Sequence, residues 1–322
     1  MKYKVLATDK VSSDGLSALA EDDRFDVTHI DDSSSEAFLE ILKVADALVV
    51  RSATKIGPAM IGLAPELKVI GRAGVGIDNV DVDAASASGV AVYNAPGGNT
   101  IAAAEMTMAL ILSLIRKIPA AERSVRDGHW DRSAFKGNEL RGRTLGLIGA
   151  GRIGGEVARR CQTFGMDCIV YDPYLTPDRA ASINVRLVDL NNVLDNADVI
   201  SIHVPLTDET RHLVDDDALS RMRSGVLVIN ASRGGVIDES ALAHALEAGA
   251  IAGAALDVYE REPLPDDSPL RDAPNLVLTP HLGGSTSEAQ VEVAREVAVH
   301  IVRHLCDGDV SGAVNASQLV ER

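Results

Sequence analysis

Short apolar runs alternate with helical patterns along almost the whole chain, and this alternation limits the possible folds more than any other feature. Strand-helix-strand units repeated in this way form parallel sheets with helices on both faces. The composition agrees, because 46% of the residues are hydrophobic and only 3% are aromatic. Helices pack on parallel sheets mainly through aliphatic side chains. The chain is therefore expected to be an α/β protein built on doubly wound parallel sheets.

The alternation falls into two series, which predicts two domains. The expected strands are residues 5–7, 47–50, 69–70 and 90–92 in the first series, and 144–148, 169–171, 199–202, 226–229, 254–256 and 275–278 in the second. Turn-forming residues separate the series, and a long apolar helix is expected to follow them. Since a second long helix follows the last strand, the C-terminal tail is expected to return to the first domain. The predicted domains are residues 1–97 with 285–322, and residues 98–284, with ligands bound at their boundary.

The formal net charge of −16 limits the partners of this chain. Nucleic acid and anionic membrane surfaces are excluded as main partners, because the negative field around the molecule would repel both. An anionic small molecule remains compatible with this charge if a few arginines reverse the sign of the potential inside a cleft.

Targeting and cysteine patterns indicate a cytoplasmic protein. The start of the chain leads directly into an apolar strand, without the hydrophobic stretch of a signal peptide. The longest candidate for a membrane span, residues 106–115, has about half of the roughly twenty residues that a span requires. Cys161, Cys168 and Cys306 form neither a metal-ligand spacing nor an even-numbered disulfide framework, which favours a reducing compartment.

A glycine-rich segment, Gly149-Ala150-Gly151-Arg152-Ile153-Gly154, follows an apolar strand and opens a helical stretch, which is the context of a dinucleotide-binding turn. The first glycine allows the tight turn, the second lets the backbone approach a pyrophosphate, and the third lets helix and strand pack closely. Asp172 ends the next apolar run, where its carboxylate can accept hydrogen bonds from a ribose and would repel a 2'-phosphate. NAD is therefore the expected cofactor, in preference to NADP.

Three polar residues, Arg233, Glu262 and His281, follow three successive strands of the second series. Arg233 can bind a substrate carboxylate through two parallel hydrogen bonds, and His281 can accept a hydroxyl proton near neutral pH. Glu262 would fix the tautomer of His281 and stabilise its imidazolium if the two side chains touch. Taken singly, the three residues also fit a surface ion pair, a loop carboxylate and a structural histidine. Together, at the edge where parallel sheets bind ligands, they predict hydride transfer from a 2-hydroxy acid.

These motifs resemble the D-isomer-specific 2-hydroxyacid dehydrogenases, and the resemblance covers essentially residues 1–316. Further matching stretches are residues 50–54 (VRSAT), 71–81 (GRAGVGIDNVD), 128–132 (GHWDR), 253–258 (GAALDV) and 314–316 (VNA). The resemblance implies two Rossmann-like domains with the active site in the cleft between them. Residues 1–97 with 285–322 would bind the substrate, and residues 98–284 would bind NAD. Arg233, Glu262 and His281 would occupy the catalytic positions.

The resemblance also assigns residues to the ligands. The NAD site would be lined by Gly149, Gly151, Arg152, Ile153, Gly154, Asp172, Ala231, Ser232, Asp257 and Gly283. Backbone amides of Gly74, Val75 and Gly76 would help to bind the substrate carboxylate. The phosphate end of a phosphorylated substrate would contact Arg51, Arg72 and Arg132, with Arg132 contributed by the neighbouring subunit of a dimer, and Asn99 would belong to the same cleft. The alternative for each arginine is a solvated surface charge.

Within the family, the similarity is greatest to members that act on D-3-phosphoglycerate. It implies NAD-dependent oxidation of that acid to 3-phosphohydroxypyruvate, the first step of phosphorylated serine biosynthesis, by a homodimer or homotetramer. Reduction of glyoxylate or hydroxypyruvate is the main alternative, because the same Arg-Glu-His set serves those reactions. A dinucleotide-sensing binding protein similar to transcriptional corepressors is a second alternative. Many of the members that act on D-3-phosphoglycerate continue into regulatory domains that bind serine, whereas only residues 317–322 follow here, either naturally or by truncation. Serine feedback through such a domain is therefore not expected.

No metal site is expected. His300 and His304 are four residues apart on the last helix, but no carboxylate or cysteine at a matching spacing completes a ligand set. His203 ends a strand near the cofactor edge, and we predict that it has a structural role.

Overall fold

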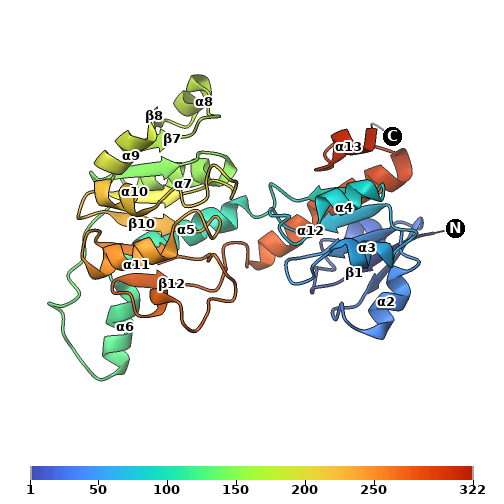
Figure 1. Cartoon of the computed structure of the whole chain (residues 1–322), viewed down its shortest axis with the longest axis horizontal. Coiled ribbons are helices and arrows are strands. Elements are labelled where there is room, and N and C mark those ends of the chain that lie inside the picture. The colour runs from blue at the N-terminus through green and yellow to red at the C-terminus, as the bar shows by residue number, and fades with distance from the viewer. Residues whose placement is uncertain (1, 321–322) are drawn as a thin grey trace. The chain divides into compact units, whose positions relative to one another are not determined.

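Two parallel sheets organise the computed structural model, which describes residues 2–320 (Figure 1). In the first sheet the strands are β1 (Tyr3–Ala7), β2 (Phe25–His29), β3 (Ala47–Val50), β4 (Val69–Arg72) and β5 (Ala91–Asn94), in the order β2-β1-β3-β4-β5. In the second they are β6 (Thr144–Ile148), β7 (Asp167–Tyr171), β8 (Arg186–Leu187), β9 (Val199–Ile202), β10 (Leu227–Asn230), β11 (Gly253–Leu256) and β12 (Leu276–Leu278), in the order β12-β11-β10-β9-β6-β7-β8. These orders confirm the predicted α/β fold of two Rossmann-like sheets. In the second sheet the strand order reverses between β6 and β9, which is the point where such sheets bind dinucleotides.

Helices connect the strands and cover the sheets. The helices of the first sheet's unit are α1 (Ser17–Ala20), α2 (Glu36–Leu42), α3 (Pro58–Gly62), α4 (Val82–Ala87), α12 (Ser287–Asp307) and α13 (Ala316–Val320). The others are α5 (Thr100–Ile115), α6 (Ile118–Arg126), α7 (Arg152–Thr163), α8 (Pro177–Ser182), α9 (Leu190–Asn196), α10 (Asp216–Arg221), α11 (Glu239–Glu247) and the 3-10 helix η1 (Pro269–Arg271). Among the described residues, none of these helices combines the length and the apolar character that a membrane span requires.

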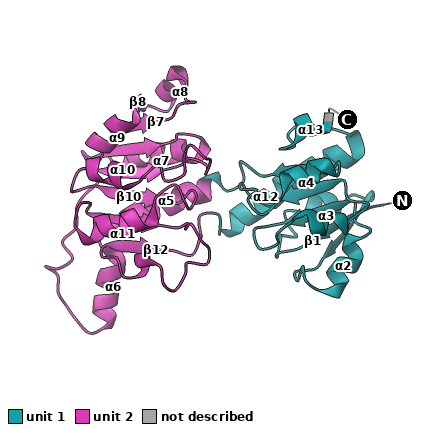
Figure 2. Ribbon diagram, viewed as in Figure 1, with its two compact units in different colours: residues 1–100, 284–322 teal, residues 101–283 magenta. Residues whose placement is uncertain are grey.

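The chain divides into two units, residues 1–100 with 284–322 (unit 1) and residues 101–283 (unit 2) (Figure 2). The boundaries differ slightly from the expected ones, with 100 in place of 97 and 284 in place of 285. The expected domain ends at residues 1 and 322 lie outside the described residues.

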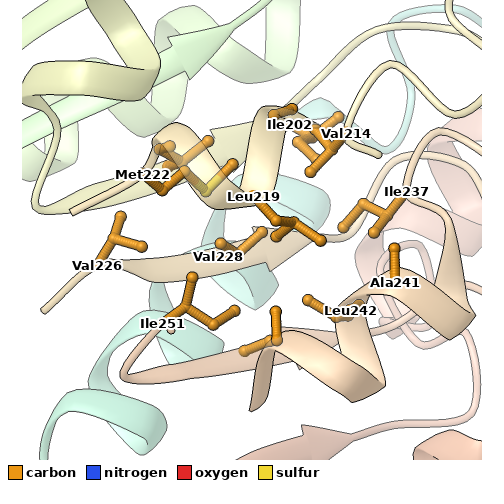
Figure 3. Close-up of a cluster of buried hydrophobic side chains, with 14 of the residues drawn as sticks. Ile202, Val214, Leu219, Met222, Val226, Val228, Ile237, Ala241, Leu242 and Ile251 are labelled. Carbon is orange, nitrogen blue, oxygen red and sulfur yellow. The ribbon is translucent and has the colours of Figure 1, made fainter. Parts of the chain in front are cut away.

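The sheet of unit 2 is buried on both faces, which explains why its strands are almost continuously apolar. Val228 and Ile229 are neighbours in β10, yet they belong to different hydrophobic clusters, because successive side chains of a strand point to opposite faces. On one face of the sheet, Val228 belongs to the same hydrophobic cluster as Leu219 of α10 and Leu242 of α11, as Figure 3 shows. A parallel sheet covered in this way gives a rigid base for the loops that leave its strands.

The sequence patterns missed β2 and β8, each at one edge of its sheet, whereas β5 and β12 at the opposite edges were expected. In β2, only Phe25 is buried, and both residues of β8 are exposed. Because a strand at an edge is paired on one side, it can be largely exposed, and β2 and β8 therefore lack the continuous apolar run that identified the other strands.

Asn315 attaches the C-terminal segment to β5 and to the turn before it. Its amide oxygen accepts a hydrogen bond of 3.0 Å from the Val92 N–H, and its amide nitrogen donates to the Val90 carbonyl and the Ser86 hydroxyl, both at 2.9 Å. The side chain is buried, with 2% of its surface exposed. These contacts satisfy backbone groups that the edge of the sheet would otherwise leave unpaired.

We expect Asn315→Ala to lower the free energy of unfolding of unit 1 by about 2–4 kcal/mol, because buried backbone groups that lose a partner cost about 1–3 kcal/mol each. Urea denaturation, with hydrogen exchange of the β5 amides, measures the change. Asn196→Ala, which removes an exposed amide from α9, is the control and should change stability by less than about 0.5 kcal/mol. Equal effects of the two substitutions would contradict this assignment.

Candidate active site

The loops after β10, β11 and β12 carry Arg233, Glu262 and His281. These strands are neighbours in the sheet and run parallel, so their carboxyl ends meet at one edge. The structure therefore places the three predicted residues at the same edge of unit 2, although 48 positions separate residue 233 from residue 281.

His281 and Glu262 form a direct contact. The Nδ1 atom of His281 lies 2.7 Å from Oε2 of Glu262, and the two side chains are 49% and 38% exposed. A carboxylate at this position favours the tautomer with the proton on Nδ1, so Nε2 is the ring nitrogen that can accept a proton. The pair therefore has the geometry of a general base held by a carboxylate.

The charges of the pair shift both pKa values. The hydrogen bond that His281 donates to Glu262 raises the pKa of His281 above 6.5, against the opposing effect of burial. The charges of Glu262 and Asp257 also raise this pKa, and the charge of Arg233 lowers it. Burial alone would raise the pKa of Glu262, but the hydrogen bond and charge of His281, the Tyr259 amide and the charge of Arg233 hold it below 4.5. Both ionised forms are thus stabilised by each other.

Asp257 holds the loop that carries His281. Its side chain is fully buried, and it accepts hydrogen bonds from the Thr279 hydroxyl at 2.6 Å, the Leu282 N–H at 2.8 Å and the Gly283 N–H at 2.7 Å. The expectation from sequence gave Asp257 and Gly283 to the NAD site. The contacts show that the carboxylate holds the Thr279 side chain before His281 and the backbone directly after it.

Arg233 belongs to a loop that is tightly packed against the loop of Glu262. A Cβ atom added to Gly234 would overlap the Tyr259 carbonyl oxygen, so only glycine allows this approach. Asn230 closes the turn by donating to the Arg233 carbonyl at 2.8 Å and accepting from the Ser232 N–H at 3.0 Å. The charge of Arg233 lowers the pKa values of both His281 and Glu262, so the guanidinium is close enough to act on both groups electrostatically.

The glycine turn after β6 fits a dinucleotide. Gly149 has a φ of +91°, and a Cβ atom added to Gly154 would lie 2.5 Å from the Gly149 carbonyl oxygen, so both positions require glycine. A Cβ atom added to Gly151 would meet nothing within 4 Å, which leaves open space at the start of α7. Backbone amides and the positive end of a helix dipole at such a position suit a pyrophosphate.

Asp172 lies at the carboxyl end of β7, next to the glycine turn. Its Oδ2 accepts from the Ala150 N–H at 2.9 Å, and its Oδ1 accepts from the Tyr174 N–H at 2.9 Å. The carboxylate is half-buried and remains able to accept further hydrogen bonds from a ribose. The remaining residues expected at the NAD site lie near the carboxyl ends of β6 and β10: Arg152 and Ile153 in the first turn of α7, and Ala231 and Ser232 directly after β10.

His203 follows β9 at the same edge. Its Nε2 lies 2.9 Å from the Ser201 hydroxyl, and burial lowers its pKa to about 4. A Cβ atom added to Gly149 would lie 2.8 Å from the His203 carbonyl oxygen, so this backbone packs against the glycine turn. These contacts agree with the predicted structural role of His203.

The expected substrate residues of unit 1 are held by two polar side chains that the sequence patterns missed. Asp9, after β1, accepts hydrogen bonds from the Arg51 N–H at 2.9 Å and the Thr54 hydroxyl at 2.6 Å. Asn79 donates to the Arg51 carbonyl at 2.7 Å and lies 3.4 Å from Nε of Arg72. Both residues position arginine-bearing loops, and their location just after strands of this sheet was the available signal.

Gly74, Val75 and Gly76 follow β4, and the Val75 carbonyl accepts a hydrogen bond of 2.6 Å from Asn94. A Cβ atom added to Gly74 would overlap Nη1 of Arg72, so the guanidinium lies against this glycine. Asn99 is also in unit 1, and its Oδ1 atom is buried without a hydrogen-bond partner among the described residues. An unsatisfied buried acceptor of this kind is consistent with a ligand that supplies a donor.

Arg132, the remaining arginine expected at the substrate phosphate, is exposed in the segment between α6 and β6 of unit 2.

The two histidines considered as metal ligands, His300 and His304, lie on α12 of unit 1. His300 stacks on Tyr93 with ring centroids 4.9 Å apart, and Nδ1 of His304 lies 3.1 Å from the Tyr93 hydroxyl. Within residues 2–320, no group of three or more His, Cys, Asp or Glu residues has the geometry to hold a metal ion.

Comparisons with known proteins agree with this geometry. A sequence model described as "D-isomer specific 2-hydroxyacid dehydrogenase, NAD binding domain" matches residues 108–283. A D-3-phosphoglycerate dehydrogenase of Bacillus subtilis (strain 168) is 47% identical over 313 residues, which are 97% of this chain and 59% of that protein. One from Archaeoglobus fulgidus is 46% identical over 312 residues, with the same shares. This chain thus spans 59% of the length of these curated relatives.

A solved structure of a protein from Thermus thermophilus is similar over nearly the whole chain. The TM-score is 0.87 at 33% sequence identity, and the match covers 97% of this chain and 99% of that one. The likeness therefore extends to both sheets as well as to the glycine turn.

Replacing Glu262 should lower the pKa of His281. In Glu262→Gln the shape is kept, but the carboxylate that raises this pKa most is lost. Because the folded-state pKa of His281 lies above the unfolded value, the stability from this pair is fully present below about pH 6.5 and is lost as the pH rises through the folded-state pKa. We expect Glu262→Gln to remove that pH dependence and to shift the imidazole titration, followed by NMR, to lower pH. An unchanged titration would contradict the proposed pairing.

Proposed function

The chain belongs to the D-isomer-specific 2-hydroxyacid dehydrogenase family, and from this premise we propose that it oxidises D-3-phosphoglycerate to 3-phosphohydroxypyruvate with NAD. This reaction is the first step of phosphorylated serine biosynthesis. The observation that carries the proposal is the contact of 2.7 Å between His281 and Glu262, beside Arg233 and at the same sheet edge as the glycine turn. The names of the curated relatives support the choice of acid.

Each residue of this group has a distinct task in the proposed reaction. Nε2 of His281 accepts the hydroxyl proton of the substrate, and Glu262 stabilises the imidazolium that results. The guanidinium of Arg233 binds the substrate carboxylate and orients the carbon that loses hydride. NAD, when bound, accepts that hydride. Raising the pKa of His281 keeps the imidazole a strong enough base for this step near neutral pH.

The phosphate end of the substrate is assigned to basic residues in an acidic protein. Arg51 and Arg72 lie on loops that Asp9 and Asn79 hold in place. These loops are therefore already ordered before the substrate binds. Backbone amides at residues 74–76 are assigned to the carboxylate, and Asn99 to the same substrate. Such preorganisation reduces the entropy lost when a charged ligand binds.

We propose a homodimer or homotetramer in which Arg132 serves the neighbouring subunit. The support is an exposed apolar surface on α6 and the segment after it: Ile118 is 50% exposed, Val125 55% and Trp130 81%. Exposed apolar side chains that gather in one region favour contact with another chain.

A cytoplasmic location is proposed as well, since all three cysteines are free thiols.

Turnover should depend on His281. We expect His281→Asn to lower kcat with D-3-phosphoglycerate and NAD by about 10²–10⁴-fold, the usual contribution of a general base. The change is measured by NADH absorbance, and His29→Asn, an exposed histidine in β2, should retain the activity of the unchanged protein. Unchanged cellular function after His281→Asn would favour the corepressor-like alternative.

Substrate choice should depend on Arg51. We expect Arg51→Gln to raise KM for D-3-phosphoglycerate by about tenfold or more, because a charge-assisted hydrogen bond to phosphate contributes about 1.5–3 kcal/mol. Turnover of glyoxylate, hydroxypyruvate and D-lactate, assayed in the same way, should be low in the unchanged protein. Efficient reduction of glyoxylate together with no oxidation of D-3-phosphoglycerate would overturn the proposed substrate in favour of a reductase.

A further inference from the structure

Tyr259 lies between the loops that carry the two members of the catalytic pair. It follows β11 by three residues, and it is 8% exposed within the hydrophobic cluster of unit 2 that Figure 3 shows in part. Burial raises the pKa of the Tyr259 phenol to about 12. The hydroxyl group is therefore a hydrogen-bond donor at every pH at which the protein would work.

The backbone of Tyr259 holds Glu262. Its N–H donates to Oε1 of Glu262 at 3.2 Å, while Oε2 of the same carboxylate contacts His281. Both oxygens of Glu262 are thus engaged, which limits rotation of the carboxylate. The Tyr259 amide at one oxygen of Glu262 therefore stabilises the orientation in which the other oxygen contacts His281.

The side chain of Tyr259 holds the turn that presents His281. Its hydroxyl donates to the Thr279 carbonyl at 2.8 Å, with a longer contact of 3.3 Å to the Leu256 carbonyl. The Thr279 carbonyl also accepts from the His281 N–H at 3.0 Å, which closes a three-residue turn across Pro280. Tyr259 therefore binds the carbonyl group that His281 itself uses to complete its turn.

This turn needs external support. His281 has a φ of +55°, a left-handed conformation that is uncommon outside glycine. Such residues persist where the surrounding contacts determine the conformation, and they often lie at functional sites. Asp257 supports the turn through the Thr279 hydroxyl and the Leu282 N–H, and Tyr259 supports it through the Thr279 carbonyl.

We propose that Tyr259 is a positioning residue that sets the alignment of His281 with Glu262, through its amide on one partner and its hydroxyl on the turn of the other. The expected effect of Tyr259 on turnover rests on the proposed function. The charged groups that face His281 are Glu262, Asp257 and Arg233, and Glu239 also faces Glu262. All four are unchanged when only the tyrosine hydroxyl is removed.

The test is Tyr259→Phe, which keeps the ring in the core and removes the hydroxyl. Weaker alignment should lower the pKa of His281, because its hydrogen bond with Glu262 is the main cause of the raised pKa. The titration is read by NMR of histidine-labelled protein, with His281→Asn identifying the signal. We expect kcat to fall about tenfold, a part of the contribution of a general base, with KM for NAD unchanged.

Tyr93→Phe is the matched control. The Tyr93 hydroxyl is also buried and donates to a backbone carbonyl, that of Asp309, at 3.0 Å, but it belongs to unit 1. Both variants should lose similar thermal stability, and only Tyr259→Phe should shift the His281 titration and kcat. If Tyr259→Phe loses stability as the control does while the titration and kcat stay those of the unchanged protein, Tyr259 is merely structural and the proposal is wrong.

The NMR titration separates this inference from the proposed function. If the unchanged protein oxidises none of the acids tested, the proposed function fails. A shifted titration in Tyr259→Phe would still support the positioning role, and an unshifted one would overturn it.

Discussion

Parallel pairing of β10, β11 and β12 is the constraint on which the candidate active site depends. The register pairs Asn230 with Leu256 and Leu256 with Leu278, so the three strands end at one level. Neighbouring strands lie about 4.8 Å apart, which brings the loops that follow them within reach of one another's side chains. Burial of both faces of the sheet fixes that register, since a slip by one residue would turn each side chain to the opposite face.

The electrostatics of the site depend on the hydrogen bonds that its carboxylates accept. In a chain of net charge −16, additional carboxylates near a base could simply repel one another. Here Asp257 is buried against two backbone amides and a hydroxyl, and Glu262 is held by an amide and by His281. The hydrogen bond with Glu262 and the charges of Glu262 and Asp257 raise the pKa of His281, while the charge of Arg233 opposes the rise. The balance suits a base that must gain and lose a proton near neutrality.

Patterns in the sequence predicted the buried parts of this structure more completely than the edges. Inner strands such as β9 and β10 are buried at every position, which produces the apolar runs that were recognised. Strands β2 and β8 have no such runs because solvent covers one side of them. Asp9, Asn79 and Tyr259 were not predicted as functional, because their importance comes from hydrogen bonds to backbone groups distant in the sequence. A single sequence places Asp9 and Asn79 after strands, but it does not show which distant groups they contact.

The sequence by itself determined the local elements: the strand, glycine turn and helix around residues 144–163, the acid at 172, and the types of residue that could perform acid-base chemistry. These follow from short-range rules of periodicity, backbone conformation and charge, which need no knowledge of distant residues. Only the tertiary structure decided that His281 contacts Glu262 at 2.7 Å, and that Asp257 and Tyr259 hold the turn on which the imidazole stands. Hydrogen bonds require separations within a few tenths of an ångström, and the packing of the whole sheet sets those separations.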